Sequence, residues 1–482
     1  MKSLTKTLSL LSVLSLMVFI SCQKEVQPKQ EPSGEMATAA NNGGHGHLQQ
    51  TKTFSSDVVV KWLNLDLDMI RLPLPAGVTA VQGGERILAY SGIALYEAVV
   101  NGMPAYQSLN GQLTAFPSMP PTTSGKAYHW AAAANAALAE VTRYLFDVAL
   151  PTPTNTVVRQ ERLNKINALE STLHDLYAAE ADDATLELSV HFGKEVGKKI
   201  SDWADGDGYK LQGGSYNPPS LQQPWHWVPT AAAPAVPINP NVSNRRLLVH
   251  GSDNGATVAP FPPFSTTPGS EFYEMANDVY TKSLSPSDEH KNLALYFRDA
   301  GEAGYYGGSG HYIAILSQVI SKSGASLDIA ALAFAKSGIA VNDAFVVGFI
   351  DKYEFYLLRP ITYLRNFAGH PTWSPLIATP NHPEFPSAHS FHAGGFLTGL
   401  ADVFGDNFEF TDNTYANMPT SLLPPGTTLK ALTFHSFTEL KKAIGDSRVY
   451  AGIHYAPSCA KGIQQGEKVG QNVLNTLKFL KE

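Results

Sequence analysis

The sequence has few cysteines and little charge for its length. Only Cys22 and Cys459 among its 482 residues are cysteines, so at most one disulfide can form and the fold must be stabilised by packing. Charged residues make up 16% of the chain, and 35 Lys and Arg stand against 42 Asp and Glu, a net charge of −7. A weakly acidic chain without a long basic run has no electrostatic footprint for nucleic acid, which we exclude as a partner.

The sequence also lacks the alternation of apolar and polar residues that is typical of half-buried strands, and its apolar residues recur at helical spacing. With 44% apolar residues the chain can bury a large core. We therefore predict an all-α fold of packed helical bundles, joined by long loops rich in proline and aromatic residues. Helices are expected over residues 86–100, 126–146, 158–179, 184–204, 312–321, 327–356, 440–450 and 462–480.

Two local patterns indicate the starts of helices. Ser285 and Pro286 are a capping residue followed by proline, which favours the first helical position. Ser436 and Glu439 have the spacing of a capping box. Between residues 206 and 268 the chain is rich in glycine, proline and aromatic residues instead, and we expect this segment to cover the helical bundle.

The first 22 residues have the pattern of an export signal. Two lysines precede an apolar stretch from Leu8 to Ile20, shorter than the roughly 20 residues that span a bilayer. Ser21 and Cys22 stand where a lipoprotein signal is cleaved, so we predict an exported protein anchored to the bacterial cell envelope only by lipid on Cys22. A membrane-spanning anchor is the alternative. Residues 23–55 would be a flexible tether and residues 56–482 a single helical domain.

Three segments between residues 340 and 460 combine basic or imidazole groups with signals of helix ends. In the first, Lys352 and Arg359 are seven residues apart, which predicts two side chains on one helix face about 10 Å apart along the axis. Pro360 is expected to end this helix at the arginine. Two long basic side chains on one face can reach a single anion.

The other two segments add the remaining groups. A proline and Ser387 precede an apolar run, so Ser387, Ala388 and His389 are expected at a helix N-terminus, where free amides favour an oxyanion. His389 is a candidate acid or base. Arg448 and His454 are six residues apart, which would place their side chains about 120° apart around the axis of an ideal helix. Each residue alone has a structural explanation, but together they supply what a tetrahedral oxyanion needs.

The order Lys-x6-Arg-Pro, Pro-Ser-Ala-His, Ser-Arg-x5-His resembles the three-part signature of the superfamily of type 2 phosphatidic acid phosphatases and vanadium-dependent haloperoxidases. The segments Asn342–Ala344, Trp227–Thr230 and Leu88–Asn101 are similar to the soluble bacterial haloperoxidase-like branch. The resemblance covers roughly residues 56–482 and implies an α-helical bundle fold.

The resemblance implies a role for each motif residue. His454 would be the axial ligand of vanadium in a haloperoxidase, or the nucleophile that forms phosphohistidine in a phosphatase, and His389 would be the acid or base. The cofactor would be vanadate, with phosphate able to occupy the same site, and no haem, flavin or nicotinamide is implied. The residues that would hold the oxyanion's oxygens are Lys352, Arg359, Ser387, Arg448 and the amide of Ala388.

Three functions follow from the resemblance. We predict a haloperoxidase that oxidises halide with hydrogen peroxide to hypohalite, because the long N-terminal helical region lacks the several membrane spans of many lipid-phosphate phosphatases. The alternatives are an acid phosphatase that hydrolyses phosphate esters and a non-catalytic oxyanion-binding lipoprotein. Halide preference, organic substrate and oligomeric state are left open.

Two positions depart from the family pattern. Ser458 stands where an aspartate commonly orients the axial histidine, and Asp446 is the nearest acid in the sequence. Ala388 replaces a glycine, which is tolerable if its φ angle is negative.

Further residues near the motifs have competing interpretations. His382 falls at a family position that influences halide preference, or is a loop histidine. With His389 and His392 it could instead suggest zinc, a site that would need neighbouring carboxylates or more histidines as ligands. The glycine-rich stretch 304–311 predicts a turn that could line the pocket. Cys459 is expected to be a buried, protonated thiol.

Overall fold

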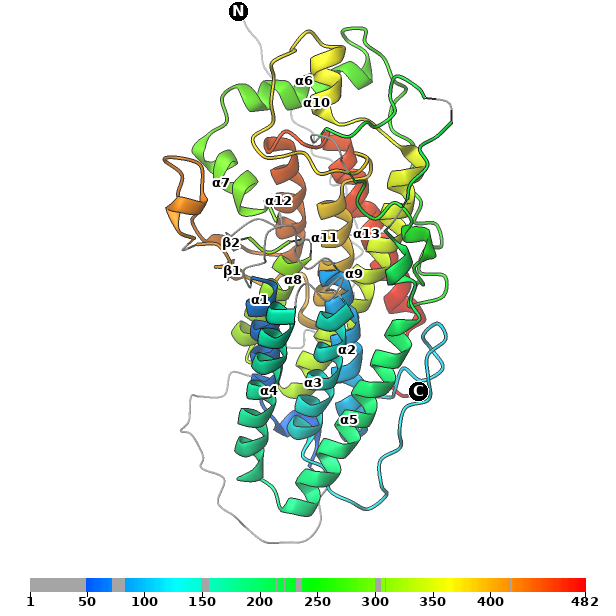
Figure 1. Ribbon diagram of the computed structural model, residues 1–482, viewed down its shortest axis with the longest axis vertical. Helices are drawn as coiled ribbons and strands as arrows, with labels where there is room; N and C mark the ends of the chain where they lie inside the picture. Colours follow the sequence, from blue (N-terminus) through cyan, green and yellow to red (C-terminus); the bar gives the residue numbers. More distant parts are fainter. Residues whose placement is uncertain are drawn as a thin grey trace, which may run out of the picture. The chain divides into compact units, whose positions relative to one another are not determined.

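Helices form almost wherever the apolar periodicity predicts them. The computed structural model describes residues 49–71, 83–148, 156–213, 215–220, 222–230, 236–299, 305–307, 309–416 and 418–482 (Figure 1). The α-helices of these residues are α1 (Asp57–Ile70), α2 (Gly84–Val99), α3 (Trp130–Val148), α4 (Thr156–Ala178), α5 (Asp183–Asp205), α6 (Glu271–Leu284), α7 (Asp288–Tyr296), α8 (Gly310–Ser323), α9 (Leu327–Phe355), α10 (Pro360–Asn366), α11 (Ala388–Phe404), α12 (Phe437–Tyr450) and α13 (Ala456–Thr476).

The strand content of the described residues is small. Two three-residue strands, β1 (Phe410–Asp412) and β2 (Leu432–Phe434), pair antiparallel with Phe410 opposite Phe434. The prediction of an all-α fold is therefore confirmed. Cys22, the predicted export signal and the tether up to residue 48 lie outside the described residues.

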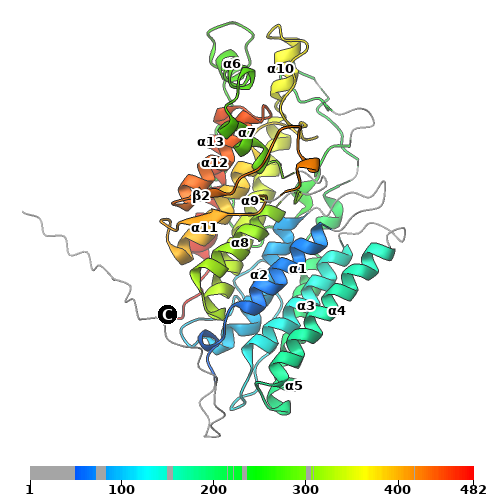
Figure 2. The ribbon, with the colours of Figure 1, turned by 90° about the vertical axis from the view of Figure 1, so that its left-hand side faces the viewer.

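The helices form two groups that meet along α2 and α9. Helices α2, α3, α4 and α5 run side by side, and α9 lies against α2 and carries α11 and α13 on its other flank (Figures 1 and 2). Helix α9 is the one described helix long and apolar enough to cross a membrane, but 89% of its apolar stretch is buried inside the protein. Packing against neighbouring helices accounts for this apolar character.

Glycines let the helices of the second group touch backbone to backbone. A Cβ on Gly466 of α13 would lie 2.1 Å from the carbonyl oxygen of Phe391 in α11. A Cβ on Gly338 of α9 would lie 2.4 Å from the carbonyl oxygen of Leu88 in α2. Interior packing at native density cannot absorb such overlaps, so any larger residue would separate the helices. This close packing fixes the start of α11 beside the start of α13.

The helix-start signals had different outcomes. Ser436 caps α12 by accepting the Glu439 N–H at 3.0 Å, as predicted. The Ser285 prediction is wrong by two residues, because Ser287 caps α7 and its hydroxyl accepts the His290 N–H at 3.1 Å. Ser287 is equally a capping residue and is followed by two acids that suit a helix N-terminus.

The aromatic segment 206–268 covers the second group of helices, as expected. Its backbone runs beside the end of α9, where the Trp227 N–H donates to the Tyr356 carbonyl at 2.7 Å and the Leu358 N–H donates to the Trp225 carbonyl at 2.9 Å. Further along, the Phe261 ring packs edge-on against Phe385. The segment therefore packs directly against residues 352–359 and 382–387.

Candidate active site

The first motif is built across a chain reversal rather than along a helix. Helix α9 ends at Phe355, because Tyr356 adopts a left-handed φ of 50°. Arg359 is then the N-cap of α10, with Pro360 as its first residue. The prediction that Lys352 and Arg359 share one helix face, and that Pro360 ends their helix, is wrong. Proline instead begins the next helix, where it needs no N–H partner.

The other two motifs lie at helix ends. Ser387 is the N-cap of α11, as predicted, and Ala388 in the first turn has a negative φ that its methyl group tolerates. Arg448 is in the last turn of α12. His454 lies beyond that helix, in the short link before α13, so the expected 120° angle on one helix is wrong. The link turns the histidine back toward Arg359.

Lys352 is completely buried beneath the second motif. Its ammonium donates to the carbonyl oxygens of Pro383 at 3.1 Å and Glu384 at 3.0 Å. Burial, and then the neighbouring Arg359, lower the pKa of Lys352 well below its ordinary value. A buried ammonium without enough negative charge around it is destabilised. A bound anion beside Lys352 would therefore stabilise its charged form.

Arg359 links the first motif to the other two. Its guanidinium is fully buried and donates to the carbonyl oxygens of His382 and Ile453, both at 3.0 Å. It also lies 3.1 Å from His454 Nε2 and 3.0 Å from His382 Nδ1. Because a guanidinium can only donate, His454 Nε2 must accept, whereas His382 Nδ1 also lies 3.0 Å from the Pro383 carbonyl, a contact that needs an N–H on that nitrogen.

His454 has its orientation and tautomer fixed by a carboxylate. Since Nε2 accepts from Arg359, the ring proton is on Nδ1, and Nδ1 donates to Glu384 Oε1 at 2.7 Å. The Tyr455 N–H donates to the same oxygen at 3.0 Å. Burial, and then Arg359 and Lys352, lower the pKa of His454 well below its ordinary value. The imidazole is neutral at physiological pH and presents a lone pair, the form that ligates a metal or attacks as a nucleophile.

Several buried polar atoms around the motifs have no hydrogen-bond partner among the described residues, and two of them are donors of the motif residues themselves. These are the Ser387 hydroxyl and Nη1 of Arg448, whose other nitrogens donate to the Ser447 hydroxyl and the Ala294 carbonyl. Buried donors in native proteins nearly always have a partner, which an ordered water or a bound ion supplies where the protein does not. A tetrahedral oxyanion accepts from hydroxyl, guanidinium and amide donors alike, so the residues present fit vanadate or phosphate.

His389 lies beside a second carboxylate. Its Nε2 is 3.5 Å from Asp299 Oδ2, which favours the tautomer with the proton on Nε2 and leaves Nδ1 as the acceptor. Burial, and then Arg448, lower the pKa of His389 to about 4. The Tyr312 hydroxyl donates to the His389 carbonyl at 3.0 Å and holds the first turn of α11. A neutral, partly accessible imidazole can take up a proton at neutral pH.

The remaining candidates are placed as follows. His382 is buried against Arg359. Burial, and then the charge of Lys352, lower its pKa well below the ordinary value.

No group of three or more His, Cys, Asp or Glu in the described part of the chain could hold a metal ion, which does not favour zinc. Cys459 is buried as predicted, and burial raises the pKa of its thiol to about 12, so it stays protonated.

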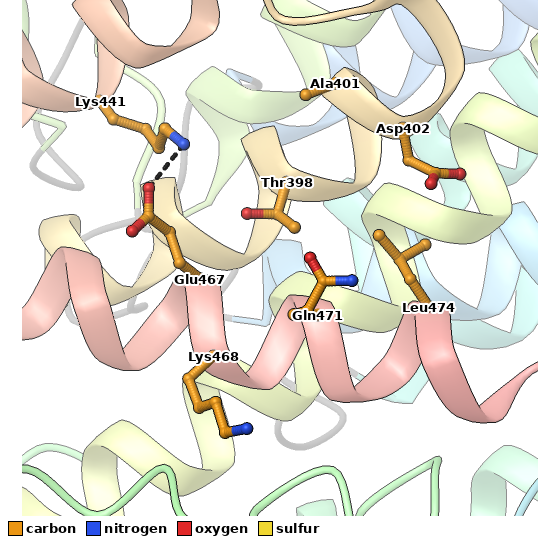
Figure 3. A pocket seen from close by; sticks show the side chains of 8 residues that line it. All are labelled: Thr398, Ala401, Asp402, Lys441, Glu467, Lys468, Gln471 and Leu474. Carbon is orange, nitrogen blue, oxygen red and sulfur yellow. Dashed lines mark hydrogen bonds and ion pairs between the residues drawn. The ribbon is translucent and has the colours of Figure 1, made fainter. Parts of the chain in front are cut away.

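The site is not the broad surface hollow of the same helices. A hollow of about 510 Å³ lies between α11, α12 and α13, where Lys441 pairs with Glu467 at 2.7 Å (Figure 3). Thr398 lines it, nine residues and about 14 Å along α11 from His389. Its two lysines are offset by Asp402 and Glu467, so it lacks the excess of positive charge that the motifs bring together.

Sequence reasoning missed the two carboxylates. Glu384 takes the place that the family gives to an aspartate at position 458, and it lies inside the second motif region, between Pro383 and Phe385. An acid among prolines and aromatics next to a candidate site was a usable signal. Asp446, the nearest acid in sequence, pairs with Lys442 on the surface. Asp299 carried no local signal, since it precedes α8 in a different part of the chain.

Substitution of Glu384 by glutamine should weaken oxyanion binding. The amide can still accept from His454 Nδ1, but the loss of negative charge lowers the basicity of Nε2, so we expect about 10-fold to 100-fold weaker orthovanadate binding, measured by titration calorimetry. The matched control is Asp446→Asn, which removes the exposed acid paired with Lys442. Equal affinities for the two variants would contradict the role of Glu384.

Comparisons with known proteins show which fold and which domain this chain resembles. Residues 332–482 match the family model of the VCPO second helical-bundle domain. The crystal structure of the first bacterial vanadium-dependent iodoperoxidase is similar, with a TM-score of 0.73 and 25% identity over 89% of this chain and 98% of that one. No curated protein matches the chain.

Two further structures share the fold at lower identity. They are the holo and apo forms of a bacterial vanadium-dependent chloroperoxidase, with TM-scores of 0.59 and 0.61 and 17% identity each. They cover 83% and 88% of this chain and 94% and 98% of the chloroperoxidase chains. The matched region, residues 332–482, holds all three motifs, and the helical fold of this chain is similar to that of bacterial vanadium-dependent haloperoxidases.

Proposed function

We propose that this protein is a vanadate-dependent haloperoxidase that oxidises halide with hydrogen peroxide to hypohalite. The observation that carries the proposal is the neutral His454, held by Glu384, beside buried cations and the unpaired donors of Ser387 and Arg448. Iodide is the first halide to test, because the similar structure at 25% identity is an iodoperoxidase.

The chain's own residues would divide the work. Lys352, Arg359 and Arg448 would neutralise the oxyanion, with the Ser387 hydroxyl and the Ala388 amide donating to its oxygens. His454, with its proton held on Nδ1 by Glu384, would offer the Nε2 lone pair to the bound group. Bound vanadate would supply Lewis acidity that makes a peroxide oxygen reactive toward halide, without a change of oxidation state.

His389 would handle the proton. With Nε2 directed at Asp299, its Nδ1 would take a proton from hydrogen peroxide and later return it to the oxygen that leaves as water. Hydrogen peroxide, halide and one proton thus give hypohalous acid and water. His382 remains the candidate halide-site residue, because it is a second buried imidazole, besides His454, that contacts Arg359.

The decisive test is an assay of purified protein loaded with orthovanadate. We expect peroxide-dependent iodide oxidation, and a loss of at least 100-fold in kcat for His389→Ala and Arg448→Ala, because each removes a transition-state interaction. Lys441→Ala, in the remote surface hollow, is the control and should keep full activity.

Other results of this assay would support the alternatives. Ester hydrolysis inhibited by vanadate, with a phosphohistidine that disappears in His454→Ala, would establish the phosphatase. Unchanged anion binding and no activity in any variant would leave the non-catalytic oxyanion-binding protein.

The pH dependence of the proposed reaction should follow His389. Because burial and Arg448 lower its pKa to about 4, the imidazole is a free base at neutral pH and becomes protonated only below pH 5. We expect kcat/KM for peroxide to be level from pH 8 to about pH 5 and to fall by tenfold per pH unit below about pH 4. A fall centred near pH 6.5 would show an ordinary histidine and contradict the assignment.

We also propose, from the sequence of residues 1–22 alone, that the protein is exported and lipid-anchored to the cell envelope through Cys22. In a bacterial host, the full chain should fractionate with membranes and Cys22→Ser should not, because the substitution removes the acceptor of the lipid. The control is Cys459→Ser, which leaves the signal intact. Membrane association of Cys22→Ser would support a spanning anchor instead.

A further inference from the structure

A third histidine lies behind His389, outside the motifs. His311, in the first turn of α8, is 1% exposed and lies between two aspartates. Its Nδ1 is 3.1 Å from Asp299 Oδ1, and its Nε2 is 2.8 Å from Asp412 Oδ2. The other oxygen of Asp299 is the one that faces His389.

This geometry determines the charge of His311. A neutral imidazole has one N–H and one lone pair, and a lone pair directed at a carboxylate oxygen would be repelled. Two carboxylates facing the two ring nitrogens therefore require two N–H groups. Burial alone would lower the pKa of His311, but Asp299 and Asp412 together raise it to about 10.

Neutral donors complete the arrangement and hold the two aspartates in place. The Tyr415 hydroxyl donates to Asp299 Oδ1 at 3.0 Å, and the Thr414 N–H donates to Asp412 Oδ1 at 2.9 Å. Burial alone would raise the pKa of Asp299, yet His311 and His389 hold it well below its ordinary value. The titratable and charged groups around the cluster are His389, His392, Tyr296, Tyr312, Tyr415 and Arg448.

We infer that His311 is a positioning residue, a buried imidazolium held between Asp299 and Asp412 that keeps Asp299 ionised and directed at His389. Its hydrogen-bond partners are Asp299 and Asp412, and Asp299 connects it to His389. A permanently ionised Asp299 would fix the His389 tautomer that leaves Nδ1 free. Only this functional consequence rests on the proposed function, since the charge of His311 does not.

The charge is tested on the full chain without vanadate, by NMR of ¹⁵N-histidine-labelled protein between pH 5 and pH 9. His311→Gln identifies the signals. We expect both ring nitrogens of His311 to keep the chemical shifts of N–H groups over the whole range. A non-protonated ring nitrogen at pH 7 would overturn the inference.

Two variants in the same cluster make the NMR test specific. Asp412→Asn removes one of the two anions, so His311 should now release a proton between pH 6 and pH 9. Tyr296→Phe removes a neutral hydroxyl that donates to the Asp412 carbonyl at 2.7 Å, and His311 should stay protonated. An Asp412→Asn protein in which His311 does not titrate would contradict the proposed arrangement.

The functional consequence is measured by turnover, with iodide oxidation or with ester hydrolysis if that is the activity found. His311→Gln should lower kcat at least tenfold and leave KM within about twofold, because it acts on His389 and not on binding. Tyr296→Phe should resemble the wild type. Equal kcat for His311→Gln and wild type would overturn the positioning role, whereas absence of peroxidase activity with His311 protonated would overturn only the proposed function.

Discussion

Uncompensated positive charge in a buried place is the constraint on which this structure depends. Lys352, Arg359 and Arg448 are each fully buried. Glu384 is the carboxylate that faces the first two, and Asp299 is the one nearest the third. Burial raises the pKa of Glu384 to about 7, so its carboxylate is only partly ionised at neutral pH and offsets less of the positive charge. An ion with two or more negative charges would balance such a cluster far better than the protein does alone.

The fold provides the means to hold these charges in place. Close contacts at glycines bring α9, α11 and α13 together, with Lys352 in the last turn of α9 and His389 in the first turn of α11. The Ser387 N–H donates to the Ser458 carbonyl at 3.2 Å, so the cap of α11 is tied directly to the first turn of α13. A residue at a helix end can be fixed by the packing of the whole helix while its own side chain points into a gap between elements.

The sequence predicted the helices and the three motifs because both are encoded over short stretches. Helical periodicity needs only a dozen residues, and Ser387 as a cap follows from its neighbours. The geometry between motifs was harder. A helix running from Lys352 to Arg359 looked continuous, and only the left-handed Tyr356 and the covering segment reverse the chain there. Such reversals depend on contacts from distant parts of the sequence.

The carboxylates show the same limit more sharply. Glu384 is 70 residues from His454 in sequence, and Asp412 is 101 residues from His311. The spacing of residues in the sequence predicts contacts within one helix or loop. The two residues of each of these pairs lie in different helices or loops. The aspartate that commonly orients this histidine is absent at position 458, and the structure places a longer acid from another loop, Glu384, at the Nδ1 nitrogen of His454. The function of orienting a ring needs a carboxylate oxygen at the right place and does not depend on the element that brings it.

The two site histidines illustrate how similar side chains acquire different chemistry. Both are made less basic by burial, but their carboxylates are in different surroundings. Glu384 lies beside the cations Arg359 and Lys352. It holds the His454 proton on Nδ1, so the Nε2 lone pair is directed at the oxyanion-binding residues. Asp299 has a second histidine behind it and stays ionised, next to an imidazole that is partly accessible. One environment suits a permanent ligand or nucleophile, and the other suits a group that must gain and lose a proton.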